Sequence, residues 1–430
     1  MSAGDTIAAV ATAPGRGGVA VVRVSGCESF GIAERLTGKR EEGRGIRVGR
    51  IADVDEGIIL TFKSPHSYTG EDVVEFQCHG GTVTPRRVLE ACLAAGARLA
   101  RRGEFTERAF LNGRLDYAQA ESVLDLIDAK TNRAADAALE GLSGRRSREA
   151  RALYETALDL STRLEHALDI DEGELPPDFL PSVSSQLSAL NSQLRTAIAK
   201  AAEGRLLRSG SLVVLAGPPN AGKSSLLNAL LEENRAIVSD VPGTTRDSIE
   251  AWIDLDGWPV RLVDTAGLRE STDEVEVEGV RRSEELIAKA DVVLMLGSCD
   301  VEKLRTGNRA CQPLNLSTSQ LLNITSKCDL ERGGGLNVSA KTGEGLDDLK
   351  RAIVAKLEEK VASSDDGDVP EGDVVAYHEA LACLDSAPES DLVLMANAVR
   401  CVAERLGKAV GATYSSDMLD NLFSRFCVGK

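Results

Sequence analysis

The order of hydrophobic and polar residues predicts a first domain that mixes strands and helices. Short β-branched runs occur at 19–24, 57–62 and 73–76. Glycine-containing turns separate these runs, a pattern typical of an α+β domain. Because the pattern continues to about residue 118, we expect an α+β domain over residues 1–118.

Helical spacing replaces this pattern in the next part of the chain. Leucines and alanines recur every three or four positions between Leu153 and Leu168, which gives one apolar stripe along a helix. Three prolines between 176 and 181 interrupt the spacing, and it resumes over 187–198. We therefore expect two long antiparallel helices joined by a proline-containing loop.

A third pattern begins at Ser211. An apolar strand at 212–216 opens an alternation of strands and helices that favours a mostly parallel sheet. The acidic stretch 363–373 is typical of a linker, and helical spacing returns after it. If this tail packs on the earlier helices, the strand-rich segment is an insertion. The predicted fold class is multidomain α/β plus α, with an α+β domain (1–118), a discontinuous helical domain (119–210 and 359–430) and an inserted domain (211–358).

Charge and cysteine content limit the possible functions. The net charge of −17 over 430 residues counts against broad, non-specific nucleic-acid binding. Arginines within 101–108 and 145–151 could form a local basic patch, although solvated helix faces are the simpler interpretation. Nine cysteines, an odd number without a CxxC pair, argue against a disulfide framework and a thiolate zinc site. The chain has no apolar run of membrane-spanning length and no signal-peptide pattern, so we expect a cytoplasmic location.

A phosphate-binding loop is predicted directly after the strand 212–216. Residues 217–224 carry glycines, a lysine and a serine at the spacing of a P-loop, and a helical run follows. In such a loop the backbone N–H groups surround the phosphates. Lys223 then neutralises phosphate oxygens, and the Ser224 hydroxyl binds Mg²⁺.

Two further segments have the character of nucleotide switches. Asp264 to Gly267 follow an apolar strand, which places a carboxylate near Mg²⁺ and a glycine amide beside the γ-phosphate. Upstream, Thr244 and Thr245 offer hydroxyls that close on Mg²⁺ when the γ-phosphate is present, and Thr245 is the predicted Mg²⁺ ligand. Both threonines also fit an ordinary loop.

The choice of base is predicted from two segments near residues 326 and 339. The Asp329 carboxylate can accept hydrogen bonds from guanine N1–H and from its 2-amino group. The backbone of Ser339 to Lys341 can reach the guanine carbonyl oxygen O6. Ser326 stands where G domains normally carry Asn, so we expect a lost amide contact and weaker nucleotide binding. The predicted GTP-binding residues are Asn220, Ala221, Gly222, Lys223, Ser224, Ser225, Ser239, Thr244, Thr245, Asp264, Thr265, Ala266, Gly267, Ser326, Lys327, Asp329, Ser339, Ala340 and Lys341.

The residue that orients the attacking water is not the usual glutamine. Leu268 occupies the position where many GTPases carry it. The acidic run 273–276 follows, and Glu276 is our candidate for the catalytic role. The alternative is that this run is a solvated loop.

Motifs outside the inserted domain 211–358, the predicted G domain, indicate which family of GTPases the chain resembles. They lie at 5–26 and 423–430, near the two ends of the chain, and at 68–81 and 103–116. Together they resemble the MnmE/TrmE family of tRNA-modification GTPases over nearly the whole chain. The resemblance implies a folate-binding N-terminal domain, a helical domain made from the centre and the C-terminal part, and an inserted G domain.

The resemblance also implies a folate site. Arg23, Glu75, Arg114 and Lys430 match positions that bind 5-formyltetrahydrofolate or a related one-carbon tetrahydrofolate, although position 114 is more often Lys in the family. In this interpretation the basic groups pair with the folate glutamate and Glu75 accepts hydrogen bonds from the pterin. For Arg114, a plain surface charge is an equally good interpretation.

A potassium site and two further candidates follow from the same resemblance. Asn220, Ser239, Val241 and Thr244 match residues that hold K⁺, whose charge replaces an arginine finger when two G domains meet. Glu276 matches the family's water-positioning glutamate. Cys427, in the C-terminal motif, is a candidate nucleophile toward uridine or a redox group, with a plain structural cysteine as the alternative.

The function that the resemblance implies is an enzyme. It is a homodimeric, K⁺-dependent GTP hydrolase that works with a flavoprotein partner of the MnmG type and a folate one-carbon donor. Its product is a carboxymethylaminomethyl group on C5 of the wobble uridine of certain tRNAs. The alternative is a GTP-dependent RNA or ribosome-assembly switch, which the G domain alone would equally allow.

Overall fold

The computed structural model describes residues 4–40, 43–170, 175–218, 220–233, 250–264, 285–297, 321–326, 328, 335–363, 373–385, 391–411 and 422–429. The chain divides into two compact units. The first unit comprises residues 1–124, 140–148 and 412–430, and the second comprises 125–139 and 149–411. Within the described residues, no helix combines the length and apolar character that crossing a membrane requires.

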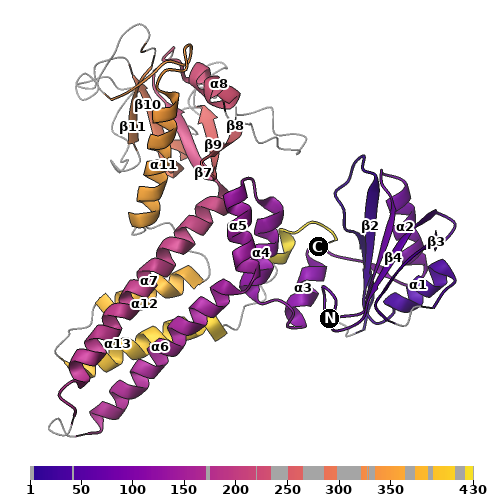
Figure 1. Ribbon diagram of the computed structural model, residues 1–430, viewed down its shortest axis with the longest axis horizontal. Helices are drawn as coiled ribbons and strands as arrows, with labels where there is room; N and C mark the ends of the chain where they lie inside the picture. Colours follow the sequence, from indigo (N-terminus) through magenta and orange to yellow (C-terminus); the bar gives the residue numbers. More distant parts are fainter. Residues whose placement is uncertain are drawn as a thin grey trace. The chain divides into compact units, whose positions relative to one another are not determined.

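The first unit contains a six-stranded sheet, with two helices on one of its faces (Figure 1). The strand order is β3-β4-β5-β2-β1-β6. Side chains of both helices are buried against the sheet in one hydrophobic cluster. The strands are β1 (Ile7–Val10), β2 (Val19–Ser25), β3 (Gly45–Ile51), β4 (Asp55–Phe62), β5 (Val73–His79) and β6 (Arg98–Leu99), and the helices are α1 (Ser29–Thr37) and α2 (Thr84–Ala94).

The C-terminal residues 422–429 belong to this first unit. Phe423 and Phe426 are buried in a cluster with Ala120 and Val123 of α4 (Tyr117–Asp128). A short helix, α3 (Glu104–Leu111), precedes α4. The burial of these aromatic side chains groups 412–430 with the first unit. The discontinuous helical domain of 119–210 and 359–430 stays a prediction.

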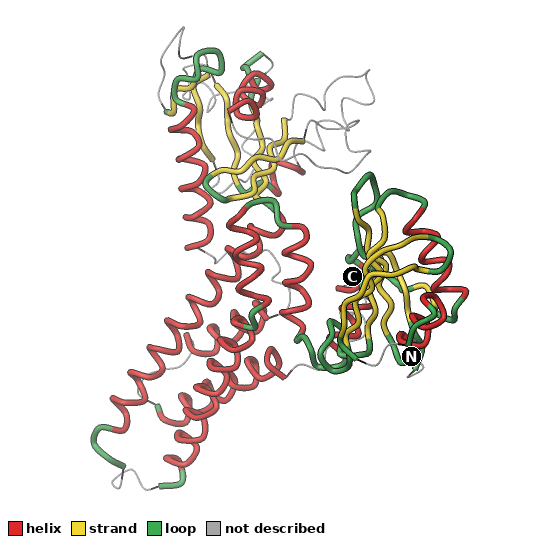
Figure 2. Tube along the Cα trace, turned by 45° about the vertical axis from the view of Figure 1, so that its right-hand side comes forward, coloured by secondary structure: helices red, strands yellow, loops and turns green. Residues whose placement is uncertain are grey.

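Long helices form one part of the second unit, and they run alongside one another (Figure 2). The predicted pair corresponds to α6 and α7, and the predicted stripe is buried except at its end, where Leu168 is 41% exposed. Leucine and alanine side chains from four helices, α6, α7, α12 and α13, share one core. The helices are α6 (Arg145–Leu168), α7 (Phe179–Ser209), α12 (Asp373–Asp385) and α13 (Leu392–Gly411), with the shorter α5 (Asn132–Leu142) before them.

The other part of the second unit contains the mostly parallel sheet that the alternation predicted. Its strand order is β12-β11-β10-β7-β9-β8, and only the β8–β9 pair is antiparallel. Hydrophobic side chains of α8 and α11 pack against it. The elements are β7 (Ser211–Ala216), α8 (Lys223–Glu233), β8 (Glu250–Leu255), β9 (Trp258–Asp264), β10 (Val292–Gly297), β11 (Leu321–Ser326), β12 (Leu336–Val338) and α11 (Leu346–Ser363).

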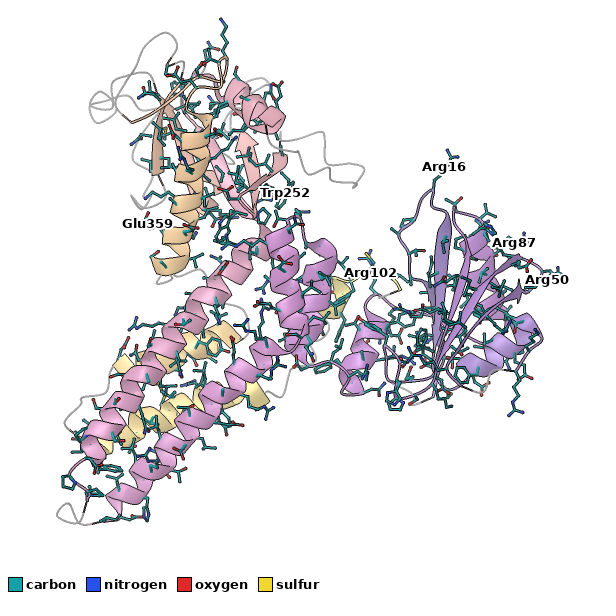
Figure 3. All side chains as sticks on the ribbon, in the orientation of Figure 1. Arg16, Arg50, Arg87, Arg102, Trp252 and Glu359 are labelled. Atoms are coloured by element: carbon teal, nitrogen blue, oxygen red, sulfur yellow. A yellow bond between two sulfur atoms is a disulfide. The ribbon has the colours of Figure 1, made fainter. Side chains whose placement is uncertain are left out.

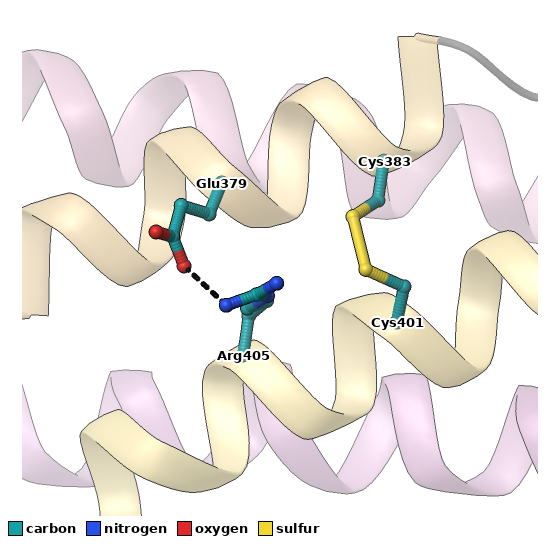
Figure 4. The surroundings of a disulfide bond; sticks show 4 residues. All are labelled: Glu379, Cys383, Cys401 and Arg405. Carbon is teal, nitrogen blue, oxygen red and sulfur yellow. Dashed lines mark ion pairs between the residues drawn. A yellow bond between two sulfur atoms is a disulfide. The ribbon is translucent and has the colours of Figure 1, made fainter.

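One disulfide corrects the expectation from cysteine content. Cys383 of α12 is bonded to Cys401 of α13, beside an ion pair between Glu379 and Arg405 (Figure 4). A count of cysteines does not show which helices face each other, and here two neighbouring helices bring the sulfurs together. Cys78 and Cys92 are buried free thiols. Burial raises the pKa of the Cys92 thiol to about 12, which leaves it an unreactive core residue.

Candidate functional sites

The P-loop lies where the sequence predicted it, between β7 and α8. Gly217 needs to be glycine, because its φ is 144° and a Cβ there would collide with the carbonyl oxygen of Leu296 in β10. Asn220 and Gly222 also have positive φ values, 62° and 92°. These conformations let the backbone turn sharply before the helix begins at Lys223.

Lys223 and Ser224 are held by the ends of two neighbouring strands. The Lys223 side chain is 5% exposed, and its Nζ donates to the carbonyl oxygens of Gly217 and Pro218 at 3.0 and 2.9 Å. Ser224 Oγ donates to Asp264 Oδ2 at 2.6 Å. Asp264 is fully buried at the carboxyl end of β9. A lysine, a hydroxyl and a carboxylate therefore meet at one edge of the sheet, where ligands of such folds bind.

Two of the predicted guanine-binding residues, Ser326 and Ser339, lie at the carboxyl ends of β11 and β12. Ser326, at the end of β11, donates from Oγ to the Ala221 carbonyl oxygen at 2.6 Å. Ser339 is buried after β12, and its Oγ accepts from the Thr342 backbone N–H at 3.3 Å. Ala340 and Lys341 follow in the same turn. Ser326 is thus tied to the P-loop itself, a role that the sequence did not suggest.

Several predicted residues lie outside the described part of the chain. They include the proposed catalytic Glu276 and most of the switch and potassium positions. For these residues the sequence-based predictions stay predictions. They are Ser239, Val241, Thr244, Thr245, Thr265, Ala266, Gly267, Glu276, Lys327, Asp329 and Lys430.

Arg23 and Glu75 form the centre of the second candidate site. They face each other in the β2–β5 register, and Arg23 Nε donates to Glu75 Oε1 at 2.8 Å. Only 15% and 17% of their side chains are exposed. The Arg23 guanidinium lies 5.2 Å from the centre of the Tyr68 ring and 5.6 Å from that of Phe105. The guanidinium is therefore fixed by an ion pair and by two aromatic rings.

Tyr68 and Phe105 are residues whose role the sequence analysis missed. Burial raises the pKa of the Tyr68 hydroxyl, although its hydrogen bond with Thr106 and the charge of Arg23 lower it in part. The bond between Tyr68 Oη and Thr106 Oγ1 is 2.9 Å. Both aromatic residues lie in motifs already noted at 68–81 and 103–116, so the motifs were a signal. Their stacking on Arg23 depends on the tertiary fold.

Arg114 and the C-terminal residues before Lys430 contact the domain that holds the Arg23–Glu75 pair. Arg114 Nε donates to the Ser67 carbonyl oxygen at 3.2 Å, next to Tyr68. Near the C-terminus, a Cβ on Gly429 would collide with the Val10 carbonyl oxygen at the end of β1. Cys427 is exposed, and its neighbour Val428 forms a backbone bridge with Arg102. The C-terminal motif therefore packs on the domain that holds Arg23.

Arg108 does not belong to a solvated basic patch. Its side chain is 12% exposed and contacts Asp5, Glu71 and Glu104 at 2.6, 3.0 and 3.3 Å. Arg98 also binds Asp5 and Glu104. These ion pairs join the start of β1 to α3. At least one of the arginines within 101–108 is thus part of a structural network of ion pairs.

Known proteins match this chain over nearly its whole length. The family description "GTP-binding protein TrmE N-terminus" matches residues 6–114, and "MnmE helical domain" matches 117–427. The chain is 42% identical over 448 residues to the tRNA modification GTPase MnmE of Azoarcus sp. (strain BH72), covering 99% of this chain and 98% of the relative. It is 41% identical over 458 residues to the protein of that name from Symbiobacterium thermophilum, covering 99% of each. Among solved structures, the G domain of the T. maritima FeoB iron transporter is 24% identical and covers 34% of this chain and 98% of that chain. The TM-score of this match is 0.24. The chain belongs to the MnmE family of tRNA modification GTPases.

Proposed function

We propose that the chain is a GTP hydrolase that acts in tRNA modification. In this proposal a K⁺ ion assists hydrolysis, and a flavoprotein of the MnmG type and a folate one-carbon donor take part in forming the carboxymethylaminomethyl group on C5 of the wobble uridine. The supporting observation is that one chain combines the Lys223–Ser224–Asp264 arrangement with the Arg23–Glu75 pair.

The P-loop residues suit a nucleotide with Mg²⁺. Ser224 Oγ and Asp264 Oδ2 lie 2.6 Å apart, and oxygen ligands of this kind are those that Mg²⁺ prefers. When bound, Mg²⁺ supplies positive charge to the phosphate oxygens. Lys223 adds a second positive charge, and the loop amides orient the phosphates. Asn220 is the one proposed K⁺ ligand among the described residues, and Glu276 is the proposed residue for positioning water.

The Arg23–Glu75 pair restricts how a folate would bind. A folate is an extended molecule, with a pterin at one end and glutamate carboxylates at the other. Two side chains joined at 2.8 Å would meet neighbouring atoms of a ligand, so in this proposal Arg23 and Glu75 serve the same end of the folate and not opposite ends. We place both at the pterin. Glu75 accepts from the ring N–H groups, and Arg23 donates to the ring carbonyl oxygen.

A homodimer is supported by the open face of the first sheet. Ile46 and Val48 are 76% and 67% exposed, and the register places Val48 next to Ile58, which is 38% exposed. Aliphatic side chains grouped in this way on one sheet face are typical of an interface. Replacing Ile46 with Glu should therefore produce monomers in sedimentation measurements. An unchanged dimer would argue for another interface.

Nucleoside mass spectrometry tests the proposed function most directly. A host without its own family member should regain the modified wobble uridine when this chain is expressed with the flavoprotein present. Isothermal titration of the purified chain with 5-formyltetrahydrofolate tests the folate site. Arg23→Ala removes a charged hydrogen-bond donor, so we expect at least about tenfold weaker binding, whereas the control Arg50→Ala should bind normally. Normal GTP hydrolysis without folate binding or tRNA modification would favour the RNA-assembly switch.

A further inference from the structure

The β8–β9 hairpin has one end at the nucleotide site and the other among helices of the same unit. Asp264, the last residue of β9, accepts the Ser224 hydrogen bond in the P-loop. The other end is the two-residue turn Asp256-Gly257, in which both residues have positive φ. The seven residues of β9 span about 20 Å between these ends.

Thr131 joins the turn of this hairpin to the start of α5. Its Oγ1 donates to the Gly257 carbonyl oxygen at 2.7 Å and accepts from the Ala134 backbone N–H at 3.2 Å. The second bond makes Thr131 the N-cap of α5. A Cβ on Gly257 would lie 2.9 Å from the Cβ of Arg133, so the turn and the helix are in close contact.

Two cations of the same segment lie on the two tryptophans of the hairpin. Arg133 lies 4.2 Å from the ring centre of Trp258, and Lys130 lies 4.7 Å from that of Trp252, which Figure 3 labels. Arg133 also forms an ion pair with Glu203 of α7 at 2.5 Å. The hairpin is therefore held by residues at the start of α5, and Arg133 links these contacts to α7. We call Lys130, Thr131, Arg133 and Glu203 the hairpin clamp.

The hairpin is stiff enough to connect its two ends. β9 is hydrogen-bonded to β7 on one side and to β8 on the other, and six of its seven residues are buried.

Trp258 is 1% exposed, and its Nε1 has no hydrogen-bond partner within the described residues. An unpaired buried donor costs about 1–3 kcal/mol. Such a cost favours any rearrangement of the hairpin that gives this N–H a partner.

We propose that the hairpin clamp couples the nucleotide state at Asp264 to the helices α5 and α7. In this proposal the clamp contacts differ in strength between the GDP-bound and GTP-bound protein, so binding of one nucleotide loosens or tightens the hold on the helices. The clamp residues are positioning residues, since they act through β9 and touch no nucleotide. The proposal rests on GTP binding alone and requires neither the folate nor the tRNA chemistry.

Binding of two nucleotides to the full chain tests the coupling. Coupling is reciprocal: if the bound nucleotide changes the clamp, the clamp changes nucleotide affinity. Weakening the clamp must then change the ratio of the affinity for GDP to the affinity for a non-hydrolysable GTP analogue. Thr131→Asp keeps the cap acceptor but loses the donor to Gly257, and Arg133→Met loses the cation. We expect each to shift the ratio of dissociation constants by at least about fivefold. Thr131→Ser, which keeps both hydrogen bonds, should leave the ratio of the two dissociation constants at its wild-type value.

The controls separate coupling from a purely structural role. Arg195→Met breaks an ion pair with Asp385 in the helices, away from the hairpin, and should leave the ratio unchanged. Equal weakening of both nucleotides in the Thr131 and Arg133 variants, or no change in either, would show a static anchor and overturn the proposal. If these variants do not fold, Arg133→Lys keeps the charge for Glu203 but loses the planar stack. An unchanged ratio in that variant overturns the proposal as well.

Discussion

The hydroxyl of Ser326 is the contact whose removal gives the clearest quantitative prediction. It donates to the Ala221 carbonyl oxygen of the P-loop at 2.6 Å. Ser326→Ala removes this neutral hydrogen bond, worth about 0.5–1.5 kcal/mol net. Ala221 is only partly buried, so water can reach the freed carbonyl and no full desolvation cost is added. About 1 kcal/mol corresponds to roughly fivefold weaker nucleotide binding.

A fluorescent guanine nucleotide titrated into the wild-type and variant chains measures this loss. GDP and GTP should both weaken by about fivefold, because the P-loop backbone contacts the phosphates that the two nucleotides share. Ser326→Thr keeps a hydroxyl and should bind as the wild type does. Ser326→Asn introduces the amide usual in G domains and should bind at least as well. If Ser326→Ala binds both nucleotides as tightly as the wild type, the bond to Ala221 does not organise the loop and our reasoning fails.

Three other predictions test separate parts of the molecule. Lys223→Ala should weaken GTP binding at least about tenfold in the same titration, because a charged donor to the phosphates is lost; unchanged binding would contradict its assignment. Leu164→Ala, at a fully buried core position, should lower the free energy of unfolding of the helical part by about 2–5 kcal/mol in urea titrations followed by circular dichroism. Leu158→Ala, at a site 45% exposed, should change it by less than about 0.5 kcal/mol. For Glu104, burial raises the pKa of the carboxyl, but bonds from Arg98 and the Arg101 backbone lower it more, so the net pKa is depressed. Its stabilisation is present above the unfolded-state pKa and is lost as the pH falls through the folded-state pKa, so Glu104→Gln should flatten the acid limb of a thermal-stability profile against pH.

Local spacing determined much of what the sequence revealed. The P-loop needs its glycines, lysine and serine within eight residues, directly between a strand and a helix, so the pattern alone located it. The buried stripe from Leu153 to Leu164 repeats with the helical period, and the parallel sheet follows from alternating strands and helices. The two-residue turn at Asp256-Gly257 was a local signal too, since Asp-Gly favours such hairpins.

Contacts between distant parts of the chain required the tertiary structure. Arg23 and Glu75 are 52 positions apart, and their pairing depends on the β2–β5 register. Thr131 reaches Gly257 across 126 positions. Sequence motifs predicted which residues bind, because the chemistry of each side chain is local. Which end of a ligand they meet, and which helix holds the hairpin, depends on how separate elements pack, and no local pattern contains that information.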